Sequence, residues 1–316
     1  MSGFDGPGRR VVVTGAAGFI GRAVVNRIDA GGLGLVSELV LNDVSPARHP
    51  SATIVPGTFA DESVRRRLLE RPVDILFHLA SVPGGASAHD PQLGRSVNLD
   101  GSIALLDAMC AGHKPVVVYA SSIAALGGLG EQVDDRTPCR PSGSYGTHKA
   151  MIELYLADLT RRGLVDGRSL RPAGIVARPK DAFGGFATAW MSDLFYAALE
   201  RRSIALPLEP SARIWLQSID VVAANFIHAA LMPSSGLVPH RIWTLPATVV
   251  RVDSLVAALQ RQLGHGFAAT YLGGAMNLPE LDAAAAVAAG FTGDGPVEAL
   301  AHQVIAGIRR EMRPVT

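Results

Sequence analysis

The sequence predicts an α/β fold in which a doubly wound parallel sheet occupies the first half of the chain and a smaller lobe occupies the second half. Short runs of β-branched residues alternate with longer helical patterns in the first half, as is typical of βαβ units. These runs are almost wholly apolar, which indicates strands that are buried on both faces of a sheet. Beyond Arg178 the alternation weakens and glycine and proline separate shorter elements, so a second lobe is expected to begin there.

The elements follow one another in a regular order along the first half. Strands are expected at residues 11–14, 39–42, 52–55, 74–78, 116–120 and 169–171, and helices at 19–29, 61–70, 98–111 and 144–161. Two later segments, 213–231 and 242–245, contain strand-like runs and are expected to return to the first lobe. The expected domains are therefore 1–178, with a returning segment near 213–245, and 179–316, which is interleaved with the first.

Composition limits the partners that the chain is expected to bind. The 316 residues include 48% hydrophobic side chains, enough to bury a large core. Lys and Arg number 29 against 28 for Asp and Glu, so no basic field exists for nucleic acid or an anionic membrane, and a small-molecule partner is expected. No apolar stretch approaches the roughly 18 residues of a spanning helix, and residues 1–10 lack the apolar core of a signal peptide, so a cytoplasmic location is expected.

The cysteines and histidines predict no metal site. Cys110 and Cys139 are too few for a disulfide framework, and no Cys/His cluster has the spacing of zinc ligands. Four histidines are scattered along the chain and are expected to be structural or surface residues: His78, His89, His148 and His228. His89 is the best placed of them to reach a substrate, because its loop follows the fourth strand.

A glycine-rich turn joins the first strand to the first helix. The run VVVTGAAGFIG places Gly15, Gly18 and Gly21 there. A side chain at these positions would block the tight turn, the approach of the backbone to a pyrophosphate, or the close contact of helix and strand. The N-terminus of the helix offers unpaired N–H groups and the positive end of its dipole to phosphates. This context favours a dinucleotide site over an ordinary strand-to-helix turn.

An acidic residue ends the second strand. Asp43 stands 22 residues after Gly21, where a carboxylate accepts hydrogen bonds from the adenosine ribose and repels a 2′-phosphate. The alternative is a solvated turn residue, but the position relative to the glycine loop favours the ribose contact. NAD is therefore the expected cofactor, although Arg48 lies nearby and is a residue type that favours NADP.

A tyrosine and a lysine lie on one face of the helix expected at 144–161. Tyr145 and Lys149 are four residues apart. A phenol with a pKa near 10 is a poor base at neutral pH, but a neighbouring ammonium and the positive charge of the cofactor stabilise the phenolate. Upstream, Ser121 and Ser122 follow a buried strand at the edge where strand ends face the ligand crevice. We expect Tyr145 to remove a hydroxyl proton while Ser122 donates a hydrogen bond to the same oxygen.

With the glycine loop, the serine and the Tyr/Lys pair in this order, the sequence resembles the extended short-chain dehydrogenase/reductases, the NAD-dependent epimerase/dehydratase family. The resemblance covers nearly the whole chain and implies a Rossmann fold, a smaller C-terminal substrate-binding lobe and a catalytic triad of Ser122, Tyr145 and Lys149. Ser122 is preferred over Ser121 because the family's Ser or Thr stands three residues before the hydrophobic pair that precedes a glycine, here Gly127. The implied cofactor contacts are Gly15, Gly18, Phe19, Ile20, Gly21, Asp43, Thr58, Phe59, Leu79, Ala80, Ser81, Asn98, Tyr145, Lys149 and Pro172. Thr58 departs from the Asp that the family often has on the adenine side.

Three segments, 77–108, 121–128 and 144–171, resemble the D-erythronate dehydrogenases, which oxidise a four-carbon sugar acid with NAD. The run after Arg171 departs from that group, which has a longer loop containing proline and asparagine. The resemblance implies oxidation of a small hydroxy or sugar acid at a secondary alcohol, with substrate contacts from Ser81, Ser122 and Tyr145. Arg178 and Arg213 are candidates to pair with a substrate carboxylate, although each alone is more often a surface residue.

Two other functions remain open at this point. A nucleotide-sugar epimerase or dehydratase uses the same triad and holds its NAD tightly, but such members usually carry an asparagine where Gly174 stands and a tyrosine before Pro179. A catalytically silent NAD-binding sensor usually lacks the tyrosine or the lysine, and this chain has both. The resemblance also implies a homodimer formed by the helices expected at 98–111 and 144–161.

Overall fold

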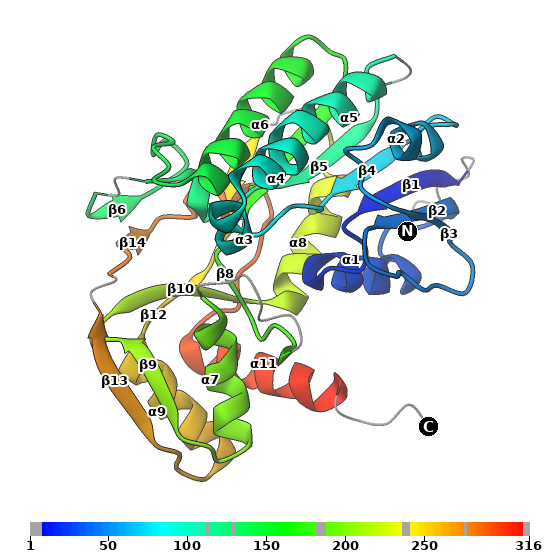
Figure 1. The fold of residues 1–316 in the computed structure, drawn as a ribbon. Coiled ribbons are helices and arrows are strands. Elements are labelled where there is room, and N and C mark those ends of the chain that lie inside the picture. Colours follow the sequence, from blue (N-terminus) through cyan, green and yellow to red (C-terminus); the bar gives the residue numbers. More distant parts are fainter. Residues whose placement is uncertain are drawn as a thin grey trace. The chain divides into compact units, whose positions relative to one another are not determined.

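The computed structural model describes residues 8–111, 114–127, 130–180, 188–235, 241–274 and 277–311 (Figure 1). Contacts divide the chain into two compact units. Unit 1 consists of residues 1–128, 138–171 and 223–243, and unit 2 of residues 129–137, 172–222 and 244–316. Compared with the division expected from the sequence, the chain leaves unit 1 after Arg171 instead of Arg178, and the segment that returns is 223–243.

Seven strands form the sheet of unit 1, in the order β11–β7–β5–β4–β1–β2–β3. They are β1 (Arg9–Thr14), β2 (Val36–Asp43), β3 (Thr53–Pro56), β4 (Ile75–His78), β5 (Val116–Ala120), β7 (Asp166–Arg171) and β11 (Ile242–Thr244). Every pairing from β3 across to β7 is parallel. The strand order reverses between β1 and β4, as in a Rossmann fold, and ligands bind outside the carboxyl ends of the strands at such a point. The predicted fold class is confirmed, and the seventh strand, β11, lies in the strand-like run 242–245 that was expected to return to the first lobe.

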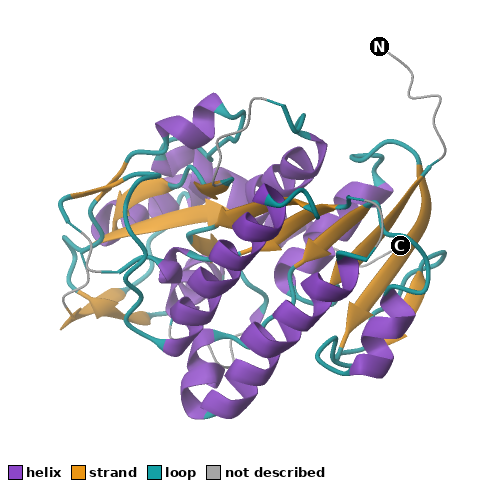
Figure 2. Cartoon of the chain, turned by 90° about the horizontal axis from the view of Figure 1, so that it is seen from above, coloured by secondary structure: helices purple, strands orange, loops and turns teal. Residues whose placement is uncertain are grey.

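Helices cover both faces of this sheet (Figures 1 and 2). They are α1 (Phe19–Asp29), α2 (Glu62–Leu68), α3 (Gly84–His89), α4 (Pro91–Arg95), the π-helix η1 (Ser96–Gly101), α5 (Ser102–Met109), the 3₁₀ turn η2 (Ile123–Ala125), α6 (Ser144–Arg161) and α8 (Ile219–Leu231). On one face, Leu106 of α5 and Leu156 of α6 pack with Val12 and Val117 of the sheet in one buried cluster. The strands are apolar because both of their faces are covered.

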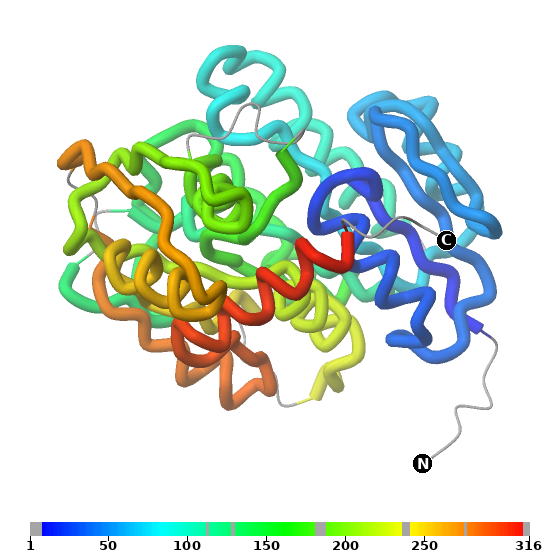
Figure 3. Tube along the Cα trace, turned by 90° about the horizontal axis from the view of Figure 1, so that it is seen from below, coloured from blue at the N-terminus to red at the C-terminus, as the bar shows by residue number. Residues whose placement is uncertain are grey.

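Unit 2 contains three small sheets and four helices among its described residues. The sheets pair β8 (Gly174–Val176) with β10 (Arg213–Ser218) and β12 (Thr248–Arg251), β9 (Ile204–Leu208) with β13 (Ala269–Gly274), and β6 (Gln132–Val133) with β14 (Glu280–Leu281). The helices are α7 (Ala189–Leu199), α9 (Val252–Leu263), α10 (Ala284–Ala288) and α11 (Val297–Glu311). Helices α9 and α11 lie side by side (Figure 3) and share a buried apolar core. Within the described part of the chain, no helix is long and apolar enough to cross a lipid bilayer.

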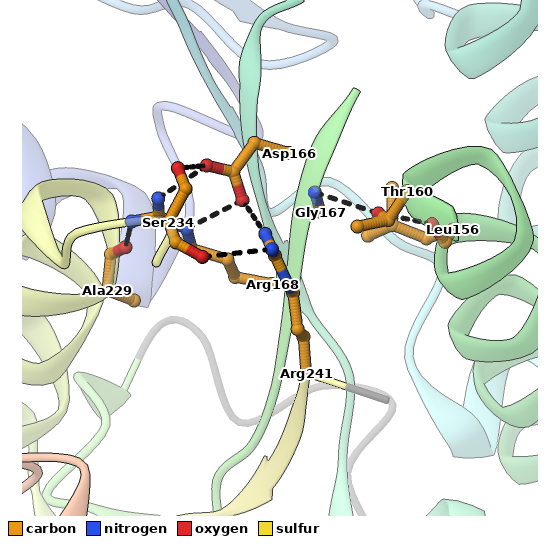
Figure 4. A network of polar contacts seen from close by, with 8 residues as sticks. All are labelled: Leu156, Thr160, Asp166, Gly167, Arg168, Ala229, Ser234 and Arg241. Carbon is orange, nitrogen blue, oxygen red and sulfur yellow. Dashed lines mark hydrogen bonds and ion pairs between the residues drawn. The ribbon is translucent and has the colours of Figure 1, made fainter. Parts of the chain in front are cut away.

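A buried charged network fastens the beginning of β7 (Figure 4). Asp166 pairs with Arg168, whose Nη2 lies 2.7 Å from Asp166 Oδ2, and it also accepts from Arg241 and from Ser234. Arg168 Nη1 donates to the carbonyl of Ala229 at the end of α8. Although burial acts in the opposite direction, the hydrogen bonds from Arg168 and Ser234 hold the pKa of Asp166 below its usual value. The network ties β7 to segments that return to unit 1 late in the sequence.

Candidate active site

The turn between β1 and α1 requires glycine where the sequence predicts it. Gly15 has a φ of 72°, and a β-carbon there would lie 2.6 Å from the backbone nitrogen of Ala80. A β-carbon on Gly21 would lie 2.0 Å from the Gly15 carbonyl oxygen, so a larger residue would push α1 away from the turn. Gly18 is the N-cap of α1 and offers no side-chain cap to its first N–H groups. These groups therefore suit an anion at the positive end of the helix dipole.

Asp43 ends β2 beside this turn. One carboxylate oxygen accepts from Ala17 N–H at 3.0 Å and the other from Ser45 N–H at 2.8 Å. A carboxylate has about four acceptor positions, so Asp43 can shape the glycine turn and still accept from ribose hydroxyls. Thr58 Oγ1 accepts from Ala60 N–H at 3.2 Å and stabilises its own turn.

The turn after β4, residues 79–82, is shaped by Asn98. Asn98 Oδ1 accepts from Val82 N–H at 2.7 Å, and Asn98 Nδ2 donates to Val82 O at 3.0 Å. Asn98 lies in the π-helix η1, which continues into α5, so the helix expected over 98–111 is present and its first part is a π-helix. Apolar periodicity over so few residues does not distinguish a π turn from an α turn, and π turns often mark functional sites. A direct contact of Asn98 with the cofactor stays a prediction.

His78 ends β4 and is buried. Its Nδ1 lies 2.8 Å from Thr14 Oγ1 and its Nε2 lies 3.0 Å from Ser102 Oγ. The ring of Phe59, which is also buried, meets the imidazole edge-on. Burial, together with the charge of Lys149, lowers the pKa of His78 to about 3. The neutral imidazole therefore joins β1, β4 and α5 inside unit 1.

Helix α6 places Tyr145 and Lys149 together. Lys149 is only 2% exposed, and its Nζ donates to the Ala120 carbonyl at 2.6 Å. The same nitrogen lies 5.5 Å from the centre of the Tyr145 ring, which is half-buried. Burial lowers the pKa of Lys149 to about 7, whereas the charge of Glu153 acts to raise it. A buried ammonium this close to the phenol favours its ionised form.

Ser122 is the second residue after the end of β5. Its Oγ caps η2 by accepting from Ala124 N–H at 3.1 Å, which leaves the hydroxyl hydrogen for another acceptor. The segment after η2 is tightly packed, because a β-carbon on Gly127 would lie 1.7 Å from the carbonyl oxygen of Arg140. Ser121, in contrast, points into the core, where its Oγ donates to Glu153 at 2.5 Å. This geometry is consistent with the choice of Ser122 over Ser121.

Two charged residues near Lys149 and Ser122 were not singled out from the sequence. Glu153 and Arg171 form a buried ion pair with Nη2 and Oε2 2.6 Å apart. Arg171 also donates to Cys139 Sγ at 2.9 Å, and burial raises the pKa of that thiol. Cys139 is therefore part of the packing around the site and not an incidental residue. The available signal was that Glu153 stands four residues after Lys149, one turn along the same helix face.

The remaining predicted residues belong to unit 2: Pro172, Arg178 and Arg213. Arg178 N–H donates to Ser192 Oγ at 2.9 Å. The Arg213 guanidinium is paired with Glu280 at 2.5 Å. A substrate carboxylate would compete with that pair. The assignment of these arginines to substrate stays a prediction.

The residues of unit 1 fit a dinucleotide. The glycine turn is so tight that a β-carbon at Gly15 or Gly21 would collide with neighbouring backbone, and α1 begins without a side-chain cap. Asp43 adds acceptors at the end of β2, and Lys149 adds a buried cation near the end of β5. These groups suit, in that order, a pyrophosphate, a ribose and the ribose next to a nicotinamide.

Residues 11–242 match the NAD dependent epimerase/dehydratase family. The chain belongs to this family. The D-erythronate dehydrogenase from Cupriavidus necator is 33% identical to this chain over 270 residues, which cover 82% of this chain and 83% of that protein. The D-erythronate dehydrogenase from Haemophilus influenzae is 31% identical over 266 residues, with 81% and 83% covered. The predicted family and its NAD cofactor are confirmed, and the names of these relatives agree with the predicted class of enzyme, an NAD-dependent dehydrogenase.

Solved structures show the same fold over almost the whole chain. A nucleoside-diphosphate-sugar epimerase from Agrobacterium tumefaciens superimposes with a TM-score of 0.86 at 29% identity and covers 95% of both chains. A GalE-like L-threonine dehydrogenase from Cupriavidus necator has a TM-score of 0.84 at 21% identity, over 95% of this chain and 99% of that one. At that identity the second likeness concerns the fold alone.

Proposed function

We propose that this chain is an NAD-dependent dehydrogenase that oxidises a secondary alcohol of a small hydroxy or sugar acid such as D-erythronate. The observation that carries the proposal is the position of the buried Lys149 Nζ. It lies 5.5 Å from the centre of the Tyr145 ring and donates a hydrogen bond to the carbonyl of Ala120 at the end of β5. The two D-erythronate dehydrogenases, each covered over more than four fifths of its length, support the class of substrate.

Each member of the triad has a distinct role in this proposal. NAD, when bound, supplies the acceptor for a hydride. Tyr145 takes the hydroxyl proton of the substrate, and Lys149 stabilises the phenolate by its charge. Ser122 donates its free hydroxyl hydrogen to the same substrate oxygen. Ser81, which lies in the turn held by Asn98, is the proposed neighbour of the substrate in unit 1.

The substrate carboxylate is proposed to pair with an arginine of unit 2. Arg178 and Arg213 are the two candidates, because a guanidinium binds a carboxylate with two parallel hydrogen bonds. Arg213 already pairs with Glu280, so its use would require an exchange of partners. Both arginines stay candidates.

The test is a panel of substrates followed by the absorbance of NADH. Four- to six-carbon aldonates and simple hydroxy acids are compared with nucleotide sugars, each with NAD in excess. Net NADH with an acid is expected. The second function under test is epimerisation of a nucleotide sugar, because the structure of the nucleoside-diphosphate-sugar epimerase from Agrobacterium tumefaciens is similar over 95% of the chain. Isomerisation of a nucleotide sugar without net NADH would establish that function and reject the dehydrogenase.

The active form is proposed to be a cytoplasmic homodimer. Both cysteines carry free thiols, as is usual in a reducing compartment. Helix α6 exposes Met151 (45%) and Leu154 (66%) on the surface of unit 1, and exposed apolar side chains on one helix suit a contact with a second copy.

A further inference from the structure

Glu153 is fully buried and contacts several of the elements that surround the triad. One carboxylate oxygen accepts from Ser121 Oγ at 2.5 Å and from Arg171 Nε at 2.7 Å. The other accepts from Arg171 Nη2 at 2.6 Å, and Cys139 Sγ lies 3.7 Å from it. The carboxylate thereby joins α6 to the residue next to Ser122, to β7 and to the segment before α6.

Glu153 also completes a buried row of charges. It follows Lys149 by one helical turn and Tyr145 by two. When Lys149 is protonated, Lys149 and Arg171 are cations and Glu153 is an anion, so the three buried groups then carry one net positive charge. The titratable groups of this row and around it come from four elements and the segment before α6: Tyr119 on β5, Arg171 on β7, His78 on β4, Lys149 and Tyr145 on α6, and Cys139 before α6.

We propose that Glu153, held by Arg171, is a positioning residue for the reaction, because its carboxylate holds the end of β5 next to Ser122 and keeps a proton on Lys149 and off Tyr145. This inference rests on the proposed function of the triad. A reactive pair with the proton on lysine needs a negative charge nearer to Lys149 than to Tyr145. Glu153 meets that condition, since it lies four residues from the first and eight from the second on one helix.

An ion pair that only supports the fold would behave differently. Buried ion pairs can often be replaced by neutral side chains of similar volume without loss of stability, whereas loss of one partner leaves an uncompensated charge. A purely structural pair therefore affects folding and the level of activity, but it has no reason to shift the pH dependence of turnover in opposite directions when different partners are removed.

Three variants test the charge on the row: Glu153→Gln, Arg171→Met and the double variant. Glu153→Gln adds one net positive charge, so the acidic limb of kcat/KM should move to lower pH by about one unit. The plateau of kcat/KM should fall roughly tenfold to a hundredfold. Above the acidic limb the Tyr145/Lys149 pair holds one proton, and without the Glu153 charge that proton resides on Tyr145 instead of Lys149. Arg171→Met should move the limb to higher pH by about the same amount. The double variant restores the net charge, so its limb should lie near that of the wild type.

A second measurement needs neither NAD nor substrate. The free energy of unfolding of the whole chain is followed by urea between pH 5 and 10. Because Lys149 has a pKa of about 7 in the folded protein against 10.5 for an ordinary lysine, stability should rise with pH in this range. The rise should begin at lower pH in Glu153→Gln and at higher pH in Arg171→Met.

The outcomes separate this inference from the proposed function. Opposite shifts of the acidic limb in the two single variants, with a wild-type limb in the double variant, support the inference. If one single variant does not fold, a shifted limb in the other and a wild-type limb in the double variant support it. The inference would be overturned if the acidic limb of kcat/KM lay at the same pH in the wild type and all the variants, or if the limb of the double variant were shifted like that of one single variant. The unfolding data decide the charge on Lys149 even if no hydroxy acid is oxidised, whereas loss of the dehydrogenase activity alone concerns the proposed function.

Discussion

A β-carbon on Gly146 would lie 1.9 Å from the carbonyl oxygen of Ala124. Gly146 follows Tyr145 at the start of α6, and Ala124 is in the turn that Ser122 caps. The backbone of α6 beside the proposed base therefore touches the backbone of the turn beside Ser122, with no side chain between them. The separation of the proposed base and the proposed hydrogen-bond donor is set by this contact.

Gly146→Ala should damage both turnover and stability. The methyl group has to push η2 away from α6, and such overpacking typically costs about 1 to 3 kcal/mol. We expect kcat to fall by about tenfold or more, since small displacements of catalytic groups have large effects. Gly143→Ala is the matched control, because nothing lies within 4 Å of its β-carbon position and its φ is −147°. Equal effects of the two substitutions on kcat would contradict the argument.

Tyr145→Phe should lower kcat by about 10²-fold to 10⁴-fold, the usual cost of losing a general base. The affinity for NAD, measured by fluorescence titration, should change by only a few-fold because the phenol acts on the substrate. Tyr155→Phe removes a hydroxyl from the same helix, where it bonds to Asp107, and should leave kcat near that of the wild type. Near-normal turnover of Tyr145→Phe at saturating substrate would remove Tyr145 as the base.

NAD should bind more tightly than NADP because of Asp43. Asp43→Asn keeps an acceptor for Ala17 N–H but loses the negative charge, so the preference for NAD should narrow while the glycine turn is preserved. Asp43→Ala should narrow the preference and also weaken NAD itself. Titration of intrinsic fluorescence with both dinucleotides gives the two affinities. Equal affinities in the wild type would mean that Arg48 or another cation dominates.

The buried lysine should make stability depend on pH. Between pH 7 and 10.5 the unfolded chain holds a proton on Lys149 that the folded chain has lost, so the free energy of unfolding rises with pH by up to about 1.4 kcal/mol per unit. Lys149→Met should lack this rise. Lys114→Met, at an exposed position, should keep it. If the free energy of unfolding depended on pH in the same way in the wild type and in Lys149→Met, the pKa of Lys149 would not be lowered in the folded protein.

Leu154→Glu should convert the proposed dimer to monomers. The substitution places a charge on the exposed apolar face of α6, where a second copy would have to bury it. Size-exclusion chromatography with light scattering measures the mass directly. Leu35→Glu, at a position that is equally exposed at 66%, is the control and should leave the mass unchanged. A wild-type chain that is monomeric at micromolar concentration would reject the dimer outright.

The features that the sequence predicted are those with local patterns. The glycine turn, the alternating strands and the Tyr145/Lys149 spacing each depend on residues within one or two elements, and the structure places them as expected. The ion pair of Glu153 with Arg171 depends on two elements that meet only in the folded chain, so no local pattern predicts the pairing. The hydrogen bonds of the Asn98 side chain escaped prediction for the related reason that they reach Val82, sixteen positions earlier.

The edge strand β11 has a consequence for how the chain is made. It consists of residues 242–244, about 71 positions after the end of β7, its neighbour in the sheet. While the ribosome has released the chain only as far as Arg178, the outer edge of β7 is unpaired. At that stage Arg168 lacks its acceptor at Ala229, and Asp166 lacks its second arginine partner, Arg241. An open strand edge invites pairing with other chains. The nucleotide-binding half therefore reaches its final form only after translation has passed residue 244, and a fragment cut at residue 178 should aggregate instead of folding as an independent module.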